Sequence, residues 1–296
     1  MSGDGRTLGD LIALAESRFR KAGLFFGHGT QNARDEAAWL VASAAKIAPD
    51  ELNRVLGHIA TKGESRRILT LIEKRITTRM PLAYLLGEAW LSGHRFFVDQ
   101  RVIIPRSFIA ELLDDGLRPW CPDPRLVKRV LDLCTGSGCL AILAAIAFPR
   151  ARIDAVDISR TALAVAQKNV RAYGLENRIS LIHSDIFKTL PLQEYDLIIS
   201  NPPYVKAQSM RTLPPEYRSE PALALAGGSN GLDIVSRIVN EADRHLKPAG
   251  HLLLEIGHNR AAFERRYPRL PVTWLSTSSE SDAVVWVAAE QLSTMG

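Results

Sequence analysis

The stretch VLDLCTGSGCLAI, residues 130–142, decides the fold of this chain of 296 residues. An apolar run typical of a buried strand leads into a glycine-rich turn, and a second apolar run of helical length follows it. Gly136 and Gly138 let the backbone approach a ligand, and the helix amino terminus after them favours an electron-rich group. Such a strand–loop–helix unit is typical of nucleotide-binding α/β proteins.

The same alternation continues to the end of the chain. Further strands are expected at 152–159, 179–187, 195–201 and 250–257, with helices at 160–174 and 231–246. This order predicts an α/β fold, a doubly wound parallel sheet with helices on both faces. The strands at 272–276 and 283–289 have no long helix between them, which predicts an antiparallel last strand.

The chain before the sheet is expected to be helical. In LGDLIALAESRFRKAG, residues 8–23, the apolar residues that recur at three- and four-residue spacing are Leu8, Leu11, Ile12, Ala15 and Phe19. The charged residues of ESRRILTLIEKR, residues 64–75, are expected to form a solvated helix face. We therefore predict a helical domain at 1–88, a β-hairpin linker at 89–104 and the α/β domain at 105–296.

Composition excludes several classes of protein. No apolar run reaches the roughly 18 residues that span a bilayer, and the first residues lack the pattern of a secretory signal. Three cysteines argue against a disulfide framework, and the seven histidines show no metal-ligand spacing. These features predict a cytoplasmic protein without membrane or metal. The net charge of +5 and pI near 9.2 are compatible with an RNA-rich or acidic partner, although many enzymes share them.

Acidic residues beside the glycine turn indicate the ligand. Asp157 ends the second strand, where a carboxylate can accept both hydroxyls of a ribose. The spacing of Gly136, Gly138 and Ala141 also satisfies the dinucleotide pattern, so NAD is a rival ligand. However, Asp132 lies just before the turn, where it suits an ammonium group better than a pyrophosphate. Together the two carboxylates favour S-adenosylmethionine, which has a ribose and an ammonium but no phosphate.

The third strand ends in SDIF, at a corner expected to face the adenine. Asp185 is a candidate acceptor for the exocyclic amine, and Ile186 a candidate to pack on the ring. The alternative for Asp185 is a cap on the following turn.

The fourth strand ends in SNPPY. Asn201 offers a carbonyl oxygen, and the carbonyl of Pro202 is free because two prolines take the backbone out of the sheet. Two fixed acceptors suit a substrate NH2 group, and Tyr204 can pack against the flat group that carries it. Orienting a weakly nucleophilic amide nitrogen toward a methyl donor is a sufficient catalytic role. The alternative is a plain turn with an Asx-type hydrogen bond.

The combination of DLCTGSG, AVDIS, SDIF and SNPPY resembles the class I, Rossmann-like S-adenosylmethionine-dependent methyltransferases that modify a glutamine side-chain amide in translation proteins. The resemblance extends over essentially the whole chain, including the helical domain. It implies catalysis by Asn201, Pro202 and Tyr204. The cofactor-binding residues that it implies are Asp132, Cys134, Thr135, Gly136, Ser137, Gly138, Asp157, Ile158, Asp185, Ile186 and Asn201.

Two branches of this family differ in substrate. Release-factor enzymes act on a glycine-glycine-glutamine loop and typically have glycine where Cys134 stands. The segments GHRFFVDQRVIIPRSFIAELL and LPPEYRSEPALALAGGSNGLDIV are more similar to the branch that acts on the third protein of the large ribosomal subunit. The resemblance adds Pro203, Arg106 and Glu220 to the substrate-binding residues. IIPRS is expected to form a lid, with Arg106 paired to Glu220 or Glu255.

Other functions remain open at this point. The same corner suits a flipped adenine, so methylation of an exocyclic amine in a nucleic-acid base is one alternative. A non-catalytic ribosome-assembly factor that retains the fold is another. The mixed charge of the helical domain disfavours the first, and the intact SNPPY and glycine turn disfavour the second.

Overall fold

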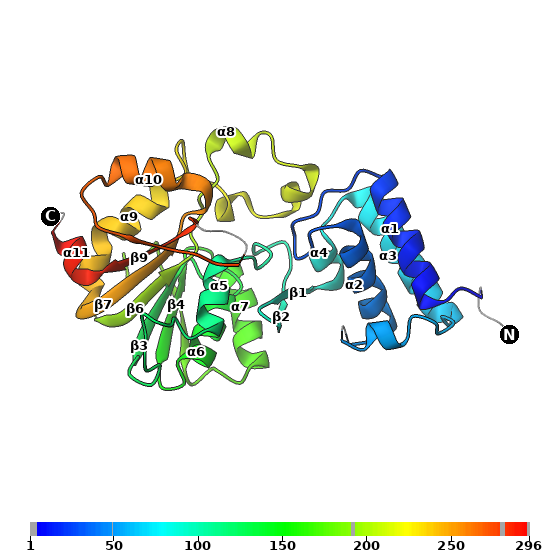
Figure 1. Ribbon diagram of the computed structural model, residues 1–296, viewed down its shortest axis with the longest axis horizontal. Helices are drawn as coiled ribbons and strands as arrows, with labels where there is room; N and C mark the ends of the chain where they lie inside the picture. Colours follow the sequence, from blue (N-terminus) through cyan, green and yellow to red (C-terminus); the bar gives the residue numbers. More distant parts are fainter. Residues whose placement is uncertain (1–4, 49, 191–192, 279–281, 295–296) are drawn as a thin grey trace. The chain divides into compact units, whose positions relative to one another are not determined.

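The computed structural model describes residues 5–48, 50–190, 193–278 and 282–294. The chain divides into two compact units, which we call the helical unit and the sheet unit (Figure 1). The helical unit comprises Met1–Ala89 and Pro214–Ser219, and the sheet unit comprises Trp90–Leu213 and Glu220–Gly296. The chain therefore passes from one unit to the other three times. We call Pro214–Ser219 the inserted segment.

The first helix is amphipathic and buries the predicted face. Leu8, Leu11, Ile12, Ala15 and Phe19 are all buried, which confirms the spacing argument. Capping boxes start the first and third helices, because a threonine and an acidic residue three positions later satisfy each other's backbone N–H. The elements of the helical unit are α1 (Leu8–Lys21), α2 (Ala33–Ala45), a 3₁₀ turn (Leu52–Arg54), α3 (Lys62–Thr78) and α4 (Leu82–Leu86). The first three α-helices pack on one another around one apolar cluster.

The interior of the helical unit also holds charge. Arg75 of α3 is fully buried, so the prediction that the charged residues of 64–75 are solvated is wrong for this one. Its guanidinium donates to Glu36 of α2 at 2.7 Å and lies 3.6 Å from Glu216 of the inserted segment. Glu216 also pairs with Arg79 at 2.8 Å and accepts from the backbone N–H of Phe25 at 3.0 Å. Arg75 is buried because these carboxylates offset the cost of removing its charge from water.

A β-hairpin joins the two units along the chain. It consists of β1 (Glu88–Leu91) and β2 (His94–Phe97). Ser92 and Gly93 connect the strands, and both have positive φ, as a two-residue hairpin turn requires. Residues 92–93 therefore form the turn of the hairpin. A helix that was not predicted, α5 (Phe108–Asp114), follows and begins at Ser107, whose hydroxyl accepts from the N–H of Ile109.

The sheet unit contains a seven-stranded sheet. The strand order is β5-β4-β3-β6-β7-β9-β8. The first five of these strands are parallel, and β9 is antiparallel to both of its neighbours, as expected for the last strands. The strands are β3 (Arg129–Leu133), β4 (Arg152–Asp157), β5 (Ile179–His183), β6 (Tyr195–Ser200), β7 (Leu246–Glu255), β8 (Thr273–Leu275) and β9 (Val284–Ala288).

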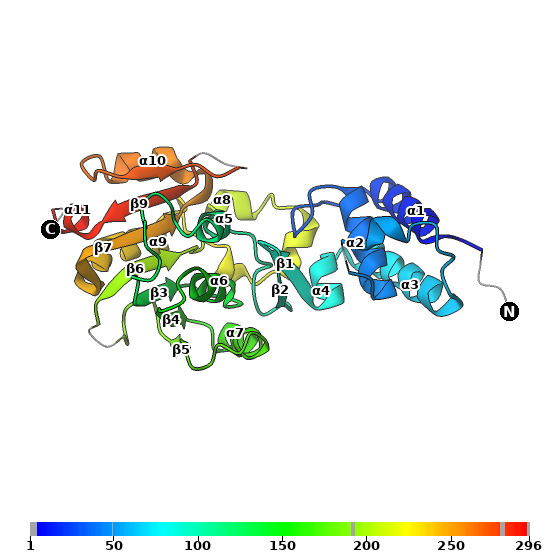
Figure 2. The same ribbon diagram turned by 60° about the horizontal axis from the view of Figure 1, so that its bottom comes forward.

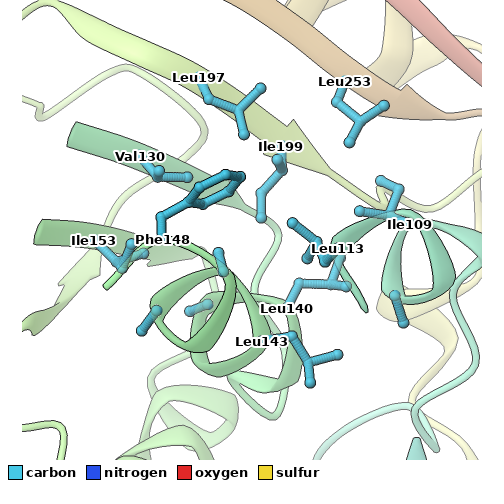
Figure 3. Packing of buried hydrophobic residues seen from close by; sticks show 14 of the residues in the cluster. Ile109, Leu113, Val130, Leu140, Leu143, Phe148, Ile153, Leu197, Ile199 and Leu253 are labelled. Atoms are coloured by element: carbon cyan, nitrogen blue, oxygen red, sulfur yellow. The ribbon is translucent and has the colours of Figure 1, made fainter. Parts of the chain in front are cut away.

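Helices cover both faces of this sheet (Figure 2). Alternate strand residues belong to two apolar clusters: Leu197 and Ile199 face one, and Ile198 faces the other. Figure 3 shows the first cluster, in which Phe148 and Leu140 lie beneath the strands. The helices of the first cluster are α5, α6 (Cys139–Ala147) and α7 (Arg160–Ala172), and those of the second are α9 (Asp233–Glu241), α10 (Arg260–Arg266) and α11 (Ala289–Ser293). Burial of both faces confirms the α/β class.

Several boundaries differ from the predictions, most of them by one or two residues. The strand expected at 179–187 ends at His183. The helix expected at 231–246 ends at Glu241 and continues as a 3₁₀ turn, and β7 begins at Leu246 instead of residue 250. A register shift between Tyr195 and Leu197 accommodates the longer strand. No helix formed by the described residues is long and apolar enough to cross a membrane.

Candidate active site

Three strands end side by side at one edge of the sheet. Leu133 at the end of β3 pairs with Val156 of β4 and with Ser200 of β6. The residues that follow these three partners are Cys134, Asp157 and Asn201. The predicted cofactor loop, its acid and the SNPPY corner are therefore neighbours, because the carboxyl ends of parallel strands share one edge.

The glycine loop, Cys134–Gly138, is held in an unusual backbone conformation. Cys134, Gly136 and Gly138 have φ of 60°, 55° and 79°. A non-glycine residue is strained there, so glycine would suit the position of Cys134. A β-carbon on Gly138 would also come within 3.1 Å of Ala166 of α7. Burial raises the pKa of the Cys134 thiol, so this side chain stays neutral.

Asp157 fixes the loop from the second strand. One carboxylate oxygen accepts from the N–H of Gly136 at 2.9 Å, and the other accepts from the N–H of Ser159 at 2.8 Å. Burial raises the pKa of this carboxyl, and the two backbone donors oppose that rise. The carboxylate therefore positions the loop and retains acceptor capacity, since each oxygen can take a second hydrogen bond.

Asp132 lies beneath the loop and is fully buried. One oxygen accepts from the hydroxyl of Thr135 at 2.5 Å, whereas the other has no hydrogen-bond partner among the described residues. Burial raises the pKa of this carboxyl to about 7, against the effect of the Thr135 hydroxyl. A carboxylate with an unsatisfied oxygen favours a cationic group nearby and disfavours a pyrophosphate.

The corner after β5 has a second strained residue. Ile186 has φ of 52° and is buried, which is rare for a β-branched residue and is found mainly at functional sites. Asp185 forms an ion pair of 2.9 Å with Arg237 of α9, and this pair lowers the pKa of the carboxyl. Ile158, after β4, is about half exposed. An exposed Ile158 and a buried Ile186 thus lie in the segments that follow the neighbouring strands β4 and β5.

The SNPPY corner is joined directly to β3. The hydroxyl of Ser200 donates to the carbonyl of Leu133 at 2.8 Å. No donor or acceptor in the described ranges bonds to the side-chain amide of Asn201 or to the carbonyl of Pro202. Pro203 packs closely, since a β-carbon on Gly227 would lie 2.9 Å from its carbonyl oxygen. The corner therefore carries two acceptors that the fold leaves available.

Tyr204 is fixed at both its backbone and its ring. Its carbonyl accepts from the side-chain amide of Asn259 at 2.9 Å, and its hydroxyl donates to Glu255 at 3.0 Å. A β-carbon on Gly257 would lie 2.6 Å from the ring, and one on Gly227 would lie 2.6 Å from the α-carbon. These glycines are needed so that the tyrosine can lie where it does.

Arg106 pairs with Glu220, one of its two predicted partners. Two parallel hydrogen bonds of 2.6 Å join the guanidinium to the carboxylate, and the N–H of Ile104 donates to Glu220 at 3.0 Å. Glu220 is buried, and its carboxylate accepts hydrogen bonds from the segment that contains Ile104 and Arg106. Ile103 of the same IIPRS stretch lies 4.0 Å from the position of a β-carbon on Gly136. The stretch thus borders the glycine loop.

Sequence reasoning missed Asn169 and Gly257, and it named Glu255 only as a possible partner of Arg106. Asn169 of α7 is buried and donates to the carbonyls of Ser137 and Phe97, so it supports the glycine loop. Its position on the apolar face of the helix, between Ala166 and Val170, was an available signal. Glu255 and Gly257 lie around Tyr204 and had no local signal beyond a charge at the end of an apolar strand.

Two family models match the chain. The model of the methyltransferase small domain matches residues 112–213, and the model of the PrmC N-terminal domain matches residues 10–87. Among solved structures, the hMettl16 catalytic domain in complex with MAT2A 3'UTR hairpin 1 is 17% identical. That match covers 84% of this chain and 91% of the other, with a TM-score of 0.52. This likeness supports the class I methyltransferase fold.

Curated relatives are much more similar and extend over almost the whole chain. A ribosomal protein uL3 glutamine methyltransferase of Bordetella pertussis is 54% identical over 98% of this chain and 97% of its own length. The protein of the same name from Burkholderia pseudomallei is 52% identical over 97% of this chain and 96% of its length. The protein of the same name from Bradyrhizobium diazoefficiens is 49% identical over 97% of this chain and 92% of its own length. The chain therefore belongs to the ribosomal protein uL3 glutamine methyltransferase family of enzymes.

Proposed function

We propose that this enzyme transfers a methyl group from S-adenosylmethionine to the side-chain amide nitrogen of a glutamine in ribosomal protein uL3. The names of its relatives support the substrate, because these proteins are about half identical to it over nearly their whole length. The chemistry of the SNPPY corner supports the reaction. The branch that modifies release factors is the nearest alternative.

The observation that carries the proposal is the pair of available acceptors beside a fixed aromatic ring. Among the described residues, none bonds to the side chain of Asn201 or to the carbonyl of Pro202, whereas Tyr204 is held by Glu255 and Asn259. A primary amide has two N–H donors and a flat conjugated face. The two acceptors match the donors, and the ring matches the face.

This arrangement acts on a poor nucleophile. The lone pair of an amide nitrogen is delocalised, so the rate depends on holding the nitrogen in line with an electrophilic carbon. S-adenosylmethionine supplies that carbon as a sulfonium methyl group. Asn201 and Pro202 orient the nitrogen, and their oxygens stabilise the positive charge that develops on it.

The residues at the glycine loop fit such a cofactor. Asp157 retains acceptor capacity for a ribose, and the unpartnered oxygen of Asp132 suits a ligand with cationic groups. NAD carries a pyrophosphate, which two carboxylates disfavour. We assign the adenine to the corner formed by Ile158, Asp185 and Ile186. Three other predicted cofactor residues belong to the same loop: Cys134, Thr135 and Ser137. Asn201 lies beside it.

We assign the remaining predicted residues to substrate binding or its support. Arg106 and Glu220 hold the IIPRS stretch against the segment after the corner, and Pro203 shapes that corner. The helical unit is proposed to recognise uL3. The cytoplasmic location and proximity to ribosomal RNA remain predictions from the sequence.

A substrate assay tests this function. The enzyme is incubated with labelled S-adenosylmethionine and one of three partners prepared without prior methylation: uL3, a release factor or nucleic acid. We expect label in uL3 alone, recovered as N5-methylglutamine after complete digestion with proteases. Label in release factor alone would overturn the choice of substrate. Label in nucleic acid alone would overturn the assignment to a glutamine amide.

A further inference from the structure

Glu255 is a buried carboxylate to which the proposed function gives no role beyond its contact with Tyr204. It ends β7, is fully buried, and accepts three hydrogen bonds. One oxygen accepts from the Tyr204 hydroxyl at 3.0 Å. The other accepts from the hydroxyl of Ser107 at 2.6 Å and from the N–H of Phe108 at 3.0 Å. The carboxylate thus joins the SNPPY corner to the start of α5.

A charge in this position is costly and needs a compensating purpose. Burial disfavours an ionised carboxylate, and the three donors only partly offset that cost. An apolar side chain of similar size would fill the same space without the penalty. What an apolar residue would not supply is an acceptor for the hydroxyl of Tyr204.

That acceptor fixes the far end of the tyrosine ring. The backbone of Tyr204 is fixed by Asn259, and Gly257 bounds one edge of the ring. The hydroxyl lies on the axis of the second side-chain torsion, so its hydrogen bond fixes the direction in which the ring points, and the contacts at the ring edge limit its plane. The fold supplies that bond from Glu255, itself held by Ser107 and Phe108.

We propose that Glu255 is a positioning residue for methyl transfer, which holds the ring of Tyr204 in place against the substrate amide. This inference rests on the proposed function, because it assumes that Tyr204 packs on the reacting group. The hydrogen bond from the phenol also makes the ring more electron-rich. An electron-rich face stabilises the positive charge that develops on the amide nitrogen.

A set of variants tests the proposal. Glu255→Leu removes both acceptors, Tyr204→Phe removes only the hydroxyl, and a double variant combines them. We expect each single change to lower kcat about tenfold with little change in KM for substrate, because it affects orientation in the transition state. The double variant should be no slower than the slower single variant, since both changes break one interaction.

Rescue by a conservative variant separates positioning from folding. Glu255→Gln keeps a polar partner for the Tyr204 hydroxyl, so its kcat should lie between those of the wild type and Glu255→Leu. Losses that multiply in the double variant, or a wild-type kcat in Tyr204→Phe, would overturn the proposal. Tyr204→Phe retains the ring and its packing, so it decides the matter even if changes at Glu255 prevent folding.

A second measurement needs no substrate. The protein contains six tyrosines, so labelling with 3-fluorotyrosine gives few fluorine signals, and Tyr204→Phe identifies the one from Tyr204. That signal should move in Glu255→Gln more than the other five, and an unmoved signal would contradict the hydrogen bond. The kinetic set uses whichever of the three partners the wild type labels. Failure to label uL3 therefore counts against the proposed substrate. An unchanged kcat in Glu255→Leu counts against the role of Glu255.

Discussion

Gly257 lies so close to Tyr204 that a β-carbon on the glycine would come within 2.6 Å of the tyrosine ring. This relationship brings together the end of β7 and the SNPPY corner, which are far apart in the sequence. The ring can occupy its place only because residue 257 lacks a side chain.

Gly257→Ala should therefore displace the ring and slow methyl transfer at least tenfold, by the same loss of orientation that a small shift of a catalytic group produces. Gly174→Ala is the matched control, because Gly174 also has positive φ (65°, against 53° at Gly257) but has no neighbour within 4 Å of a β-carbon. Steady-state rates and thermal unfolding of both variants provide the comparison. Equal losses of activity would show that backbone strain, not contact with Tyr204, is responsible.

Asn201→Ala should lower kcat at least a hundredfold, which is the effect of removing one preorganised polar group from a transition state. The affinity for S-adenosylmethionine, measured by titration calorimetry, should stay within about threefold of the wild type because other residues hold the cofactor. Asn177→Ala, at an exposed asparagine, is the control. A wild-type rate in Asn201→Ala would exclude the amide-holding role.

The stability of the protein should depend on pH through Glu255. Burial raises the pKa of this carboxyl from its ordinary value to about 7, so between about pH 4.5 and pH 7 the folded state binds more protons than the unfolded state. The free energy of unfolding therefore falls as pH rises through this window. Glu255→Gln should remove about 1 to 3 kcal/mol of that fall between about pH 5 and pH 8. Urea unfolding at both pH values measures this change in the free energy of unfolding. An equal change in wild type and variant would refute the prediction.

Glu216→Gln should destabilise the protein by about 3 to 5 kcal/mol, because it removes the buried carboxylate that pairs with Arg79 and leaves Arg75 with Glu36 alone. The control is Glu73→Gln, which breaks the pair with Arg18 and should cost less than about 1 kcal/mol, since Glu73 is about half exposed. Denaturant unfolding of the two variants gives the difference. Similar losses of unfolding free energy in the two variants would mean that the buried ion pairs of Glu216 stabilise the protein no more than an exposed pair does.

Local motifs made most of the fold and the core of the site predictable. The strands that form the sheet have both faces buried, so they appear as continuous apolar runs, and the residues that end them are adjacent to those runs in the sequence. The glycine loop, Asp157 and the SNPPY corner could therefore be placed at one edge. The helix α5 escaped prediction because seven residues give too short a pattern.

Residues that depend on distant packing were not predictable. Glu255 and Tyr204 are 51 residues apart, and nothing near either one indicates the other. Arg75 occurs in the same charged pattern as its solvated neighbours, and its buried partners Glu36 and Glu216 are both distant in the sequence. Asn169 was the exception, since a polar residue on an apolar helix face is visible in the sequence.

The inserted segment has a consequence for how this enzyme can be taken apart or recombined. A fragment cut after Ala89 would keep Arg75 and Arg79 but lose Glu216, their partner from much later in the chain. A chimera that exchanges only the first 89 residues with a relative would combine one parent's arginines with the other parent's carboxylate. A transplant of substrate recognition should therefore carry two pieces of sequence, the amino-terminal helices and the six residues that follow Leu213.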